Sequence, residues 1–496
     1  MLARQQLEAE SKEQVIRTLG AAATKLRQKL GESLRSIQKF DAIDDQATTS
    51  SLEAFKAYLL GNEQMGKDWL RAILFFGRAI ELDPKFAQAH RRLAFCYFNV
   101  GKRELAVESA KKAFALRERV SERERLSISQ FYYFNVEGDQ DKATEVLEMF
   151  KQMYPRNFVP HGNLTEVYVN RGQYEKALEE AREAIRLLPN NIFTFMALAS
   201  ALIQLNRFEE AKEVIKQAQV QKIDNISLHQ SLYHIAFVQG DAAAMKQQLD
   251  WASEKQNEHE ALDWQAWTAA FWGQARRSRE FADHAIASAQ LRKLEKRASV
   301  FAAEAAQRNA IFGNCRQTRQ EVSRALALAR DQEPVRRSAS ALALCGEAGQ
   351  AQSLIDELTK QFPKNTFVNT VWLPIVQAEI EIHRGHPAQA IQLLQSNRYE
   401  GAGDFWFPYL RGQAYLLERA GAEAAAEFQK ILDHRGQDPL SPLYPLAHLG
   451  LARAAALTGD TARSREAYEN FLTLWKDADP DLPILRAAKQ EYEKLK

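Results

Sequence analysis

One stretch, residues 158–189, constrains the fold more than any other part of the sequence. It reads FVPHGNLTEVYVNRGQYEKALEEAREAIRLLP, with helical spacing on both sides of a central glycine and a proline at its end. Small side chains recur in its second half, where they let two helix backbones approach closely. The positions that fix this pattern are Leu164, Tyr168, Gly172, Ala177, Ala181, Ala184 and Pro189.

These positions resemble the signature of the tetratricopeptide repeat (TPR), a helical hairpin with a period of about 34 residues. One hairpin cannot bury its apolar face alone, so neighbouring repeats are required. Similar spacing starts near Leu52, Asn206 takes the place of a turn glycine, and later turn glycines recur at intervals of roughly 33 to 40 residues. The expected later turn glycines are Gly240, Gly273, Gly313, Gly346, Gly385, Gly421 and Gly459.

The sequence therefore predicts an all-α protein, an α-α superhelix (TPR solenoid) of about twelve helical hairpins. We expect an N-terminal helical segment with a linker over residues 1–51, helical over 12–39. Well-formed repeats are expected over 52–223 and degenerate repeats over 224–480. A capping helix with a polar outer face is expected over 481–496.

Composition argues against several classes of partner. The net charge of +2 gives no global attraction to nucleic acid, and no apolar run is long enough to insert in a membrane. The polar start, MLARQQLEAESKEQ, does not resemble a secretory signal. We therefore expect a cytoplasmic protein by default.

The search for catalytic chemistry predicts no enzyme, no cofactor and no metal site. The stretch from Gly61 to Asp68 has the spacing of a phosphate-binding loop, but an aspartate stands where a magnesium-binding hydroxyl is needed. Cys96, Cys315 and Cys345 are few and far apart, so we expect small buried apolar residues and neither a disulfide framework nor a zinc site.

Partner binding is expected on the first helix of each hairpin, which lines the concave groove of a repeat superhelix. Aromatic side chains with Asn and Arg beside them suit an extended peptide, whereas an ordinary mixed surface remains the alternative. The candidate groove residues are Arg91, Phe95, Phe98, Asn99, Tyr132, Asn135, Glu166 and Asn170.

Two aromatic clusters lie in the later repeats. Either they pack between repeats that have fewer alanines, or they form an aromatic patch that binds a peptide. The residues are Trp264, Trp267, Phe271 and Trp272 in one cluster, and Phe405, Trp406, Phe407 and Tyr409 in the other.

The runs SKEQVIRTLGAAATKLRQKLGESLRSIQKFD, ATTSSLEAFKAYLLGNE and AEFQKILDHRG resemble bacterial serine/threonine protein kinases that carry C-terminal TPR arrays. In that family a kinase domain and a membrane span precede this region, and both are missing here. The resemblance implies the sensor or regulatory part of a split or truncated kinase, with a serine/threonine kinase encoded nearby as partner. It also implies a periplasmic location for a detached sensor.

Two functions are thus weighed. The first is a non-catalytic scaffold that binds a peptide or protein in its groove, and the second is the kinase-linked sensor. A hidden active site within the repeats is a third and weaker hypothesis.

Overall fold

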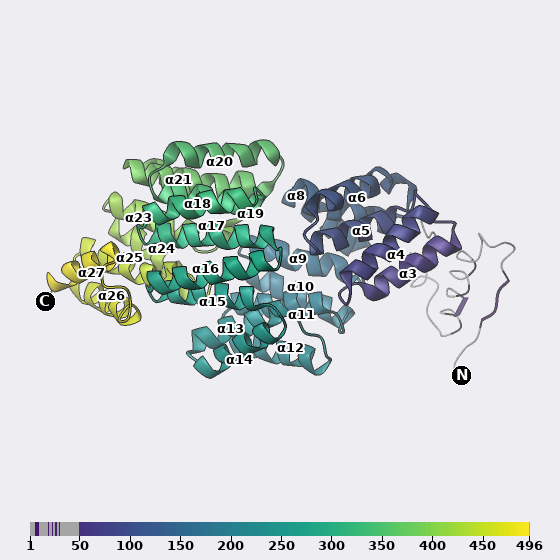
Figure 1. Cartoon of the computed structure of the whole chain (residues 1–496), viewed down its shortest axis with the longest axis horizontal. Helices are drawn as coiled ribbons and strands as arrows, with labels where there is room; N and C mark the ends of the chain where they lie inside the picture. Colours follow the sequence, from purple (N-terminus) through teal and green to yellow (C-terminus); the bar gives the residue numbers. More distant parts are fainter. Residues whose placement is uncertain are drawn as a thin grey trace. The chain divides into compact units, whose positions relative to one another are not determined.

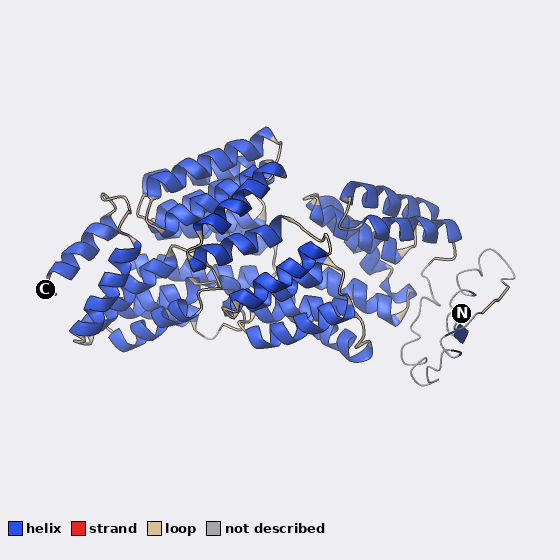
Figure 2. Ribbon diagram, turned by 90° about the horizontal axis from the view of Figure 1, so that it is seen from below, coloured by secondary structure: helices blue, strands red, loops and turns tan. Residues whose placement is uncertain are grey.

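The computed structural model describes residues 49–395 and 397–495, together with residues 5–8, 18, 22, 25, 26 and 29. The helix expected over 12–39 and the linker over 40–51 lie largely outside the described residues. Every regular element in the described part is helical, and no strand occurs there (Figure 2). None of the described helices is both long and apolar enough to cross a membrane.

Helices α3 to α26 pair into twelve hairpins within the described residues, which confirms the expected α-α superhelix (Figure 1). The first helices of the hairpins are α3 (Leu52–Gln64), α5 (Ala87–Asn99), α7 (Glu122–Tyr132), α9 (Phe158–Asn170), α11 (Ile192–Gln204), α13 (Ile226–Gln239), α15 (Glu258–Phe271), α17 (Glu295–Ile311), α19 (Gln332–Leu344), α21 (Leu373–Arg384), α23 (Trp406–Leu417) and α25 (Leu443–Leu457). The second helices are α4 (Trp69–Leu82), α6 (Arg103–Ala115), α8 (Gln140–Met153), α10 (Tyr174–Leu187), α12 (Phe208–Val220), α14 (Ala242–Glu254), α16 (Ala275–Leu291), α18 (Cys315–Leu328), α20 (Ala348–Gln361), α22 (Pro387–Leu394), α24 (Gly421–Asp433) and α26 (Thr461–Leu474). A single helix, α27 (Pro483–Glu493), follows them.

The chain forms two compact units, Met1–Leu164 and Thr165–Lys496, and the division falls within α9. Each unit is described by itself below as the first and the second unit. The predicted boundary between well-formed and degenerate repeats at residue 223 stays a prediction.

The small residues of the repeat signature pack as expected. Ala177, Ala181 and Ala184 of α10 are completely buried. Because a larger side chain at these positions would hold the neighbouring helix away, the alanine stripe sets how closely the hairpins stack.

The turns confirm the repeat period with one correction. Six of the seven expected glycines, and also Asn206, have the positive φ of a left-handed turn. Gly421 is wrong as a turn residue, because it is the first residue of α24 and Arg419 holds the left-handed position with φ 59°. The lack of a Cβ at Gly421 instead admits the Ala454 carbonyl oxygen, which would lie 2.7 Å from such a Cβ.

The expectation for the cysteines is wrong at two of the three positions. Cys315 and Cys345 form a disulfide, whereas Cys96 is a buried free thiol as expected. The two bonded residues are 30 apart in sequence, close to one repeat period. They therefore occupy equivalent turns of neighbouring hairpins, at the start of α18 and the end of α19.

The second unit curls back on itself. Asn206, in the turn between α11 and α12, donates from Nδ2 to the Asp433 carbonyl oxygen (2.9 Å) and accepts at Oδ1 from the Gly436 amide (2.7 Å). Trp475 donates from Nε1 to the Phe271 carbonyl oxygen at 3.0 Å. These bonds join segments more than 200 residues apart in sequence. Later parts of the second unit thus pack on its earlier turns.

Gly436 makes the closest of these approaches possible. A Cβ at this position would lie 1.8 Å from the carbonyl oxygen of Ile203 in α11. No side chain fits there, so the returning loop can reach the turn after α11 only with glycine at this position.

Candidate functional site

Part of the predicted groove set gathers around the Phe131 ring in the first unit. Phe95 and Phe98 of α5 contact that ring edge-on, with centroids at 6.3 and 6.0 Å. The Arg91 guanidinium lies 5.7 Å from the same ring centre, although its side chain is buried. We call these four residues the Phe131 cluster. Its phenylalanines at 95 and 98 are half-buried and partly accessible.

The remaining groove candidates do not join the Phe131 cluster. Asn99 and Asn135 each donate an amide hydrogen to a carbonyl four residues earlier, at 2.8 and 3.1 Å, so part of their hydrogen-bonding capacity is used locally. The Tyr132 ring stacks on Phe114 with centroids 4.0 Å apart. Glu166 and Asn170 belong to the second unit. The predicted site residues therefore stay a prediction as a set.

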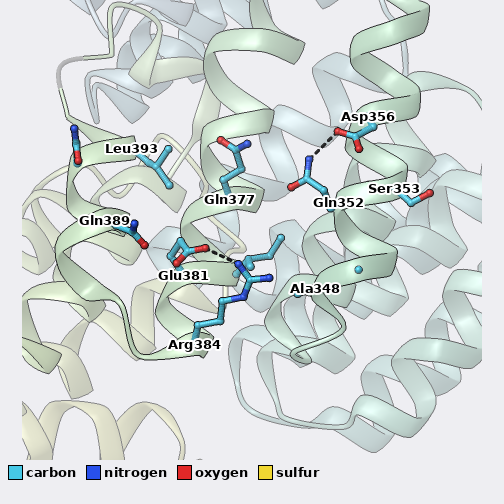
Figure 3. Close-up of a pocket in the computed structure, with 12 residues that line it drawn as sticks. Ala348, Gln352, Ser353, Asp356, Gln377, Glu381, Arg384, Gln389 and Leu393 are labelled. Carbon is cyan, nitrogen blue, oxygen red and sulfur yellow. Dashed lines mark hydrogen bonds and ion pairs between the residues drawn. The ribbon is translucent and has the colours of Figure 1, made fainter.

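A groove of about 940 Å³ lies between α20, α21 and α22 (Figure 3). Its charged groups already pair with neighbours on the same helix. Gln352 donates to Asp356 at 2.7 Å, and Arg384 donates to Glu381 at 2.8 Å. The groove is open and its main polar contacts are satisfied, so it gives little sign of a specific ligand.

A smaller and more polar cavity, of about 310 Å³, lies within the second unit. First helices of four successive hairpins, α13, α15, α17 and α19, form one part of its wall. The returning segments around Trp406 and residues 438–443 form the rest. Because the first helices would otherwise face an open groove, the return of the chain converts that groove into a cavity. We call it the inner cavity.

Carboxylates outnumber cations in the lining of the inner cavity. Two guanidiniums line it, and both are already paired: Arg297 forms two hydrogen bonds with Glu260, and Arg337 donates from Nε to Glu333 at 2.6 Å. Desolvation lowers the pKa of the lining imidazole of His234 to about 4, so this group is neutral at pH 7. The lining carboxylates are those of Asp263, Glu304, Asp404 and Asp438.

The lining residue Asp263 is hydrogen-bonded to the buried Arg308. Its Oδ1 accepts from Arg308 Nη1 at 3.4 Å, and the Arg308 guanidinium lies 4.5 Å from the centre of the Trp267 ring. Desolvation and the neighbouring Glu304 charge raise the pKa of Asp263 to about 8, against the lowering effect of Arg308. The positive charge near Asp263 is therefore too small to offset the cost of ionising this buried carboxyl group.

Two of the residues that line the cavity each have one buried polar atom with no hydrogen-bond partner among the described residues. One is Oε2 of Glu304, whose Oε1 lies 3.6 Å from Arg337 Nη2. The other is Nε1 of Trp264, a residue that is 2% exposed. Buried polar groups are normally hydrogen-bonded, so these two unpaired atoms show that the polar groups around the cavity are incompletely satisfied within the protein.

Asp404 is held in a backbone conformation that normally requires glycine, with φ 48° and ψ −126°. Non-glycine residues in such regions cost about 1–3 kcal/mol and cluster at functional sites. Its side chain is exposed to solvent, although many protein atoms surround the carboxyl group and partly desolvate it. This desolvation and the nearby Asp438 raise the pKa of Asp404 to about 7, although Arg336 and Arg337 act to lower it. The fold therefore holds an ionisable side chain at a position where the backbone is strained.

The two aromatic clusters divide between core and cavity. Phe271, Phe405 and Phe407 are buried in the core, as the packing interpretation predicts. Trp264, Trp267 and Trp406 line the inner cavity. Sequence reasoning therefore found the indoles but missed the carboxylates, because acidic residues are common on every outer helix face of the chain.

The near-match to a phosphate-binding loop has a structural explanation. Asp68 caps the N-terminus of α4 by accepting from the Arg71 amide at 2.9 Å, and α3 precedes the loop where a strand would be needed. In the part of the chain that is described, no group of three or more His, Cys, Asp or Glu side chains is arranged to hold a metal ion.

Comparison with protein families matches residues 194–219 to the tetratricopeptide repeat, which confirms the predicted motif over most of α11 and most of α12. The kinase-linked part of the resemblance stays a prediction.

Among solved structures, PilW, described as a widely conserved type IV pilus biogenesis factor, is 17% identical and overlaps 41% of this chain and 94% of its own, with a TM-score of 0.32. The pilF protein of Pseudomonas aeruginosa is 20% identical over 41% of this chain and 91% of its own, with a TM-score of 0.29. Yeast Tom70 is 16% identical over 89% of this chain and 95% of its own, with a TM-score of 0.28. Likeness at this level carries no argument about function.

Proposed function

We propose that this protein is a non-catalytic interaction scaffold whose helical hairpins bind a peptide or protein partner. The observation that carries the proposal is the array of twelve hairpins built on the repeat pattern, since such stacks present long surfaces rather than a single reaction centre.

Within this proposal the Phe131 cluster of the first unit is the contact surface. Half-buried aromatic rings beside a guanidinium provide apolar area at little cost in conformational entropy, and such residues dominate binding energy in interfaces. The exposed Asn99 next to them keeps a carbonyl oxygen to accept from a peptide amide.

A displayed peptide library selected on the full chain tests this surface. A selected peptide should lose about tenfold or more in affinity to the Phe98→Ala variant. The matched control is Leu74→Ala, which removes another accessible apolar side chain, 73% exposed on α4. Failure to select any saturable binder contradicts the scaffold proposal. Equal binding by both variants moves the surface away from the Phe131 cluster.

A second proposal is the regulatory or sensor part of a serine/threonine kinase system. The Cys315–Cys345 disulfide favours it, because disulfides persist mainly in oxidising compartments such as the periplasm, where a detached sensor would lie. The kinase itself would be a separate partner chain.

Cell fractionation with thiol labelling tests the second proposal. It predicts a fully oxidised Cys315–Cys345 pair in protein recovered from the periplasm, and changed autophosphorylation of a neighbouring kinase when this chain is added. Reduced cysteines in cytoplasmic protein would contradict it.

A further inference from the structure

The inner cavity has the features of a built ligand site rather than of a packing defect. Its wall carries two more carboxylates than guanidiniums. Arg297 pairs with Glu260 outside the lining, and Arg337 pairs with Glu333 outside it and with Glu304 within it. Empty cavities in proteins are usually apolar, whereas polar ones are filled by water or ligand.

Three indole rings, those of Trp264, Trp267 and Trp406, share this wall with the carboxylates. An aromatic face attracts an organic cation through its negative quadrupole, and indole does so best. Trp267 already shows this preference, because the Arg308 guanidinium covers its ring at 4.5 Å.

The same unit holds one of its own cations in this manner. The Arg435 guanidinium lies 4.4 Å from the Phe271 ring centre and 3.9 Å from that of Tyr444. Burial among these rings lowers the pKa of Arg435 to about 10, which still leaves it charged at neutral pH. Aromatic faces in this unit therefore stabilise a buried guanidinium.

From these features we propose that the inner cavity binds an organic cation, an ammonium or guanidinium group. The carboxylates of Glu304 and Asp404 accept its hydrogen bonds, and the indoles contact its apolar stem. Glu304 is 7% exposed and lines the cavity, and its Oε2 is buried without a hydrogen-bond partner among the described residues, so a donor that reaches this carboxylate relieves an unfavourable burial. The Asp404 carboxylate forms no hydrogen bond or ion pair with any described residue, and Asp404 lies in a strained loop that glycine would occupy more easily.

The aromatic walls select an organic cation over a bare metal ion. A metal ion would need several oxygen ligands converging at fixed short distances, and no such group occurs among the described residues. At about 310 Å³ the cavity is at the lower limit of small-molecule sites, which suits one alkylammonium or alkylguanidinium group. The group can belong to a free amine or to a lysine or arginine side chain of a peptide.

Isothermal titration calorimetry on the full chain, at fixed salt, tests the proposal. The probes are butylammonium and methylguanidinium, with neutral butyramide as the matched control. A second arm uses a capped five-residue alanine peptide with a central arginine, against the same peptide with citrulline. Binding of the free cations alone identifies a small-molecule site, and binding of the arginine peptide as well identifies a side-chain site.

Variants place the binding in the inner cavity. Asp404→Asn and Glu304→Gln remove one charge each at constant size and should weaken cation binding by about tenfold or more. Asn is well tolerated at positive φ, so Asp404→Asn should keep the fold, as circular dichroism will confirm. The control is Glu254→Gln, which removes one exposed charge of α14 outside the cavity and should leave affinity unchanged.

Three results would overturn the proposal. These are no saturable binding of either cation at millimolar concentration, equal binding of butyramide, and a loss with Glu254→Gln as large as that with Asp404→Asn. The peptide selected on the first unit is a separate measurement, so failure of the scaffold proposal leaves this result interpretable.

Discussion

The two units are built from the same kind of helical hairpin but differ in the sequence separation of the residues that their hydrogen bonds join. In the first unit, hydrogen bonds such as Arg92 to Tyr58 and Asn163 to Gln130 join residues 34 and 33 apart, which is one repeat. In the second unit, the bonds from Asn206 and Trp475 close over more than 200 residues. A repeat array thus need not stay open. Return of the chain onto its own first helices replaces a peptide-sized groove by a polar cavity.

The largest expected effect comes from blocking the closest approach in the second unit. Gly436→Ala places a methyl group where the Ile203 carbonyl oxygen stands, and should lower the free energy of unfolding by about 4 kcal/mol. The matched change in the first unit, Gly77→Ala in α4, meets nothing within 4 Å and should stabilise by about 1 kcal/mol. Urea denaturation followed by tryptophan fluorescence measures both. Equal midpoints for the two variants would contradict a closed second unit.

Next in size is the disulfide, which also belongs to the second unit. Because it closes a loop of 30 residues, its reduction should cost about 3.6 kcal/mol, since the unfolded chain gains conformational entropy when the cross-link is broken. Thermal melts with and without dithiothreitol measure the loss. The Cys315→Ser, Cys345→Ser double variant should melt at the lower temperature under both conditions. A melt of the wild type that dithiothreitol leaves unchanged would show that the bond does not form.

A smaller effect is expected from one closing hydrogen bond. Trp475→Phe removes the donor to the Phe271 carbonyl oxygen and leaves that buried acceptor unpaired, at a cost of about 1–2 kcal/mol. Trp69→Phe in α4 trims the same atoms in the first unit and should cost less, since no hydrogen bond of its indole nitrogen occurs among the described residues. A larger loss of stability for Trp69→Phe than for Trp475→Phe would contradict the view that only the second unit is closed by this hydrogen bond.

The effect of pH on stability is ranked last, because the Asp404 side chain is exposed and solvent screens its interactions. The pKa of Asp404 is raised to about 7 in the folded chain, so the folded state holds this proton more tightly than the unfolded state does. As pH rises from about 4 to 7 the wild type therefore loses stability relative to Asp404→Asn. The variant should melt close to the wild type at pH 4 and higher than the wild type at pH 8. A difference in melting temperature between variant and wild type that shrinks as pH rises would contradict a raised pKa of Asp404.

Cation affinity should change with pH in the opposite sense. The groups that face Asp404 are Asp438 from the loop after α24 and Glu333, Arg336 and Arg337 from α19. Since only the ionised carboxylate attracts a cation, binding of butylammonium should strengthen as pH rises through about 7. The Asp404→Asn variant should show a weaker pH dependence.

Local pattern was sufficient to predict the fold but not the closure. The alanine stripe of α10 and the left-handed turns follow from helical spacing, which a single repeat of sequence carries. Gly421 was assigned to a turn because it had the right interval, although its close contact is with Ala454, more than 30 residues away. The disulfide was not predicted for the same reason. Cys315 and Cys345 come together only because their turns lie next to each other when the hairpins stack.

The inner cavity could not be predicted from the sequence for a related reason. Trp264 and Trp267 stand out in the sequence, yet nothing in α15 indicates that Asp404 and Asp438 come to face them. Their meeting depends on the return of the chain, which rests on single residues such as Gly436 and Asn206. Such residues do not recur at a regular interval in the sequence, and they do not stand out in its composition.

The amide proton of Gly436 gives the most direct measurement of closure. It donates to Asn206 Oδ1 at 2.7 Å, across 230 residues of sequence. Asn206→Gly removes this acceptor and keeps a residue that accepts the positive φ of 57°, so backbone strain does not confuse the result. Hydrogen exchange should show a Gly436 amide that is protected in the wild type and exchanges fast in the variant, while α10 amides stay unchanged. Fast exchange of Gly436 in the wild type would contradict the closed second unit and, with it, the inner cavity.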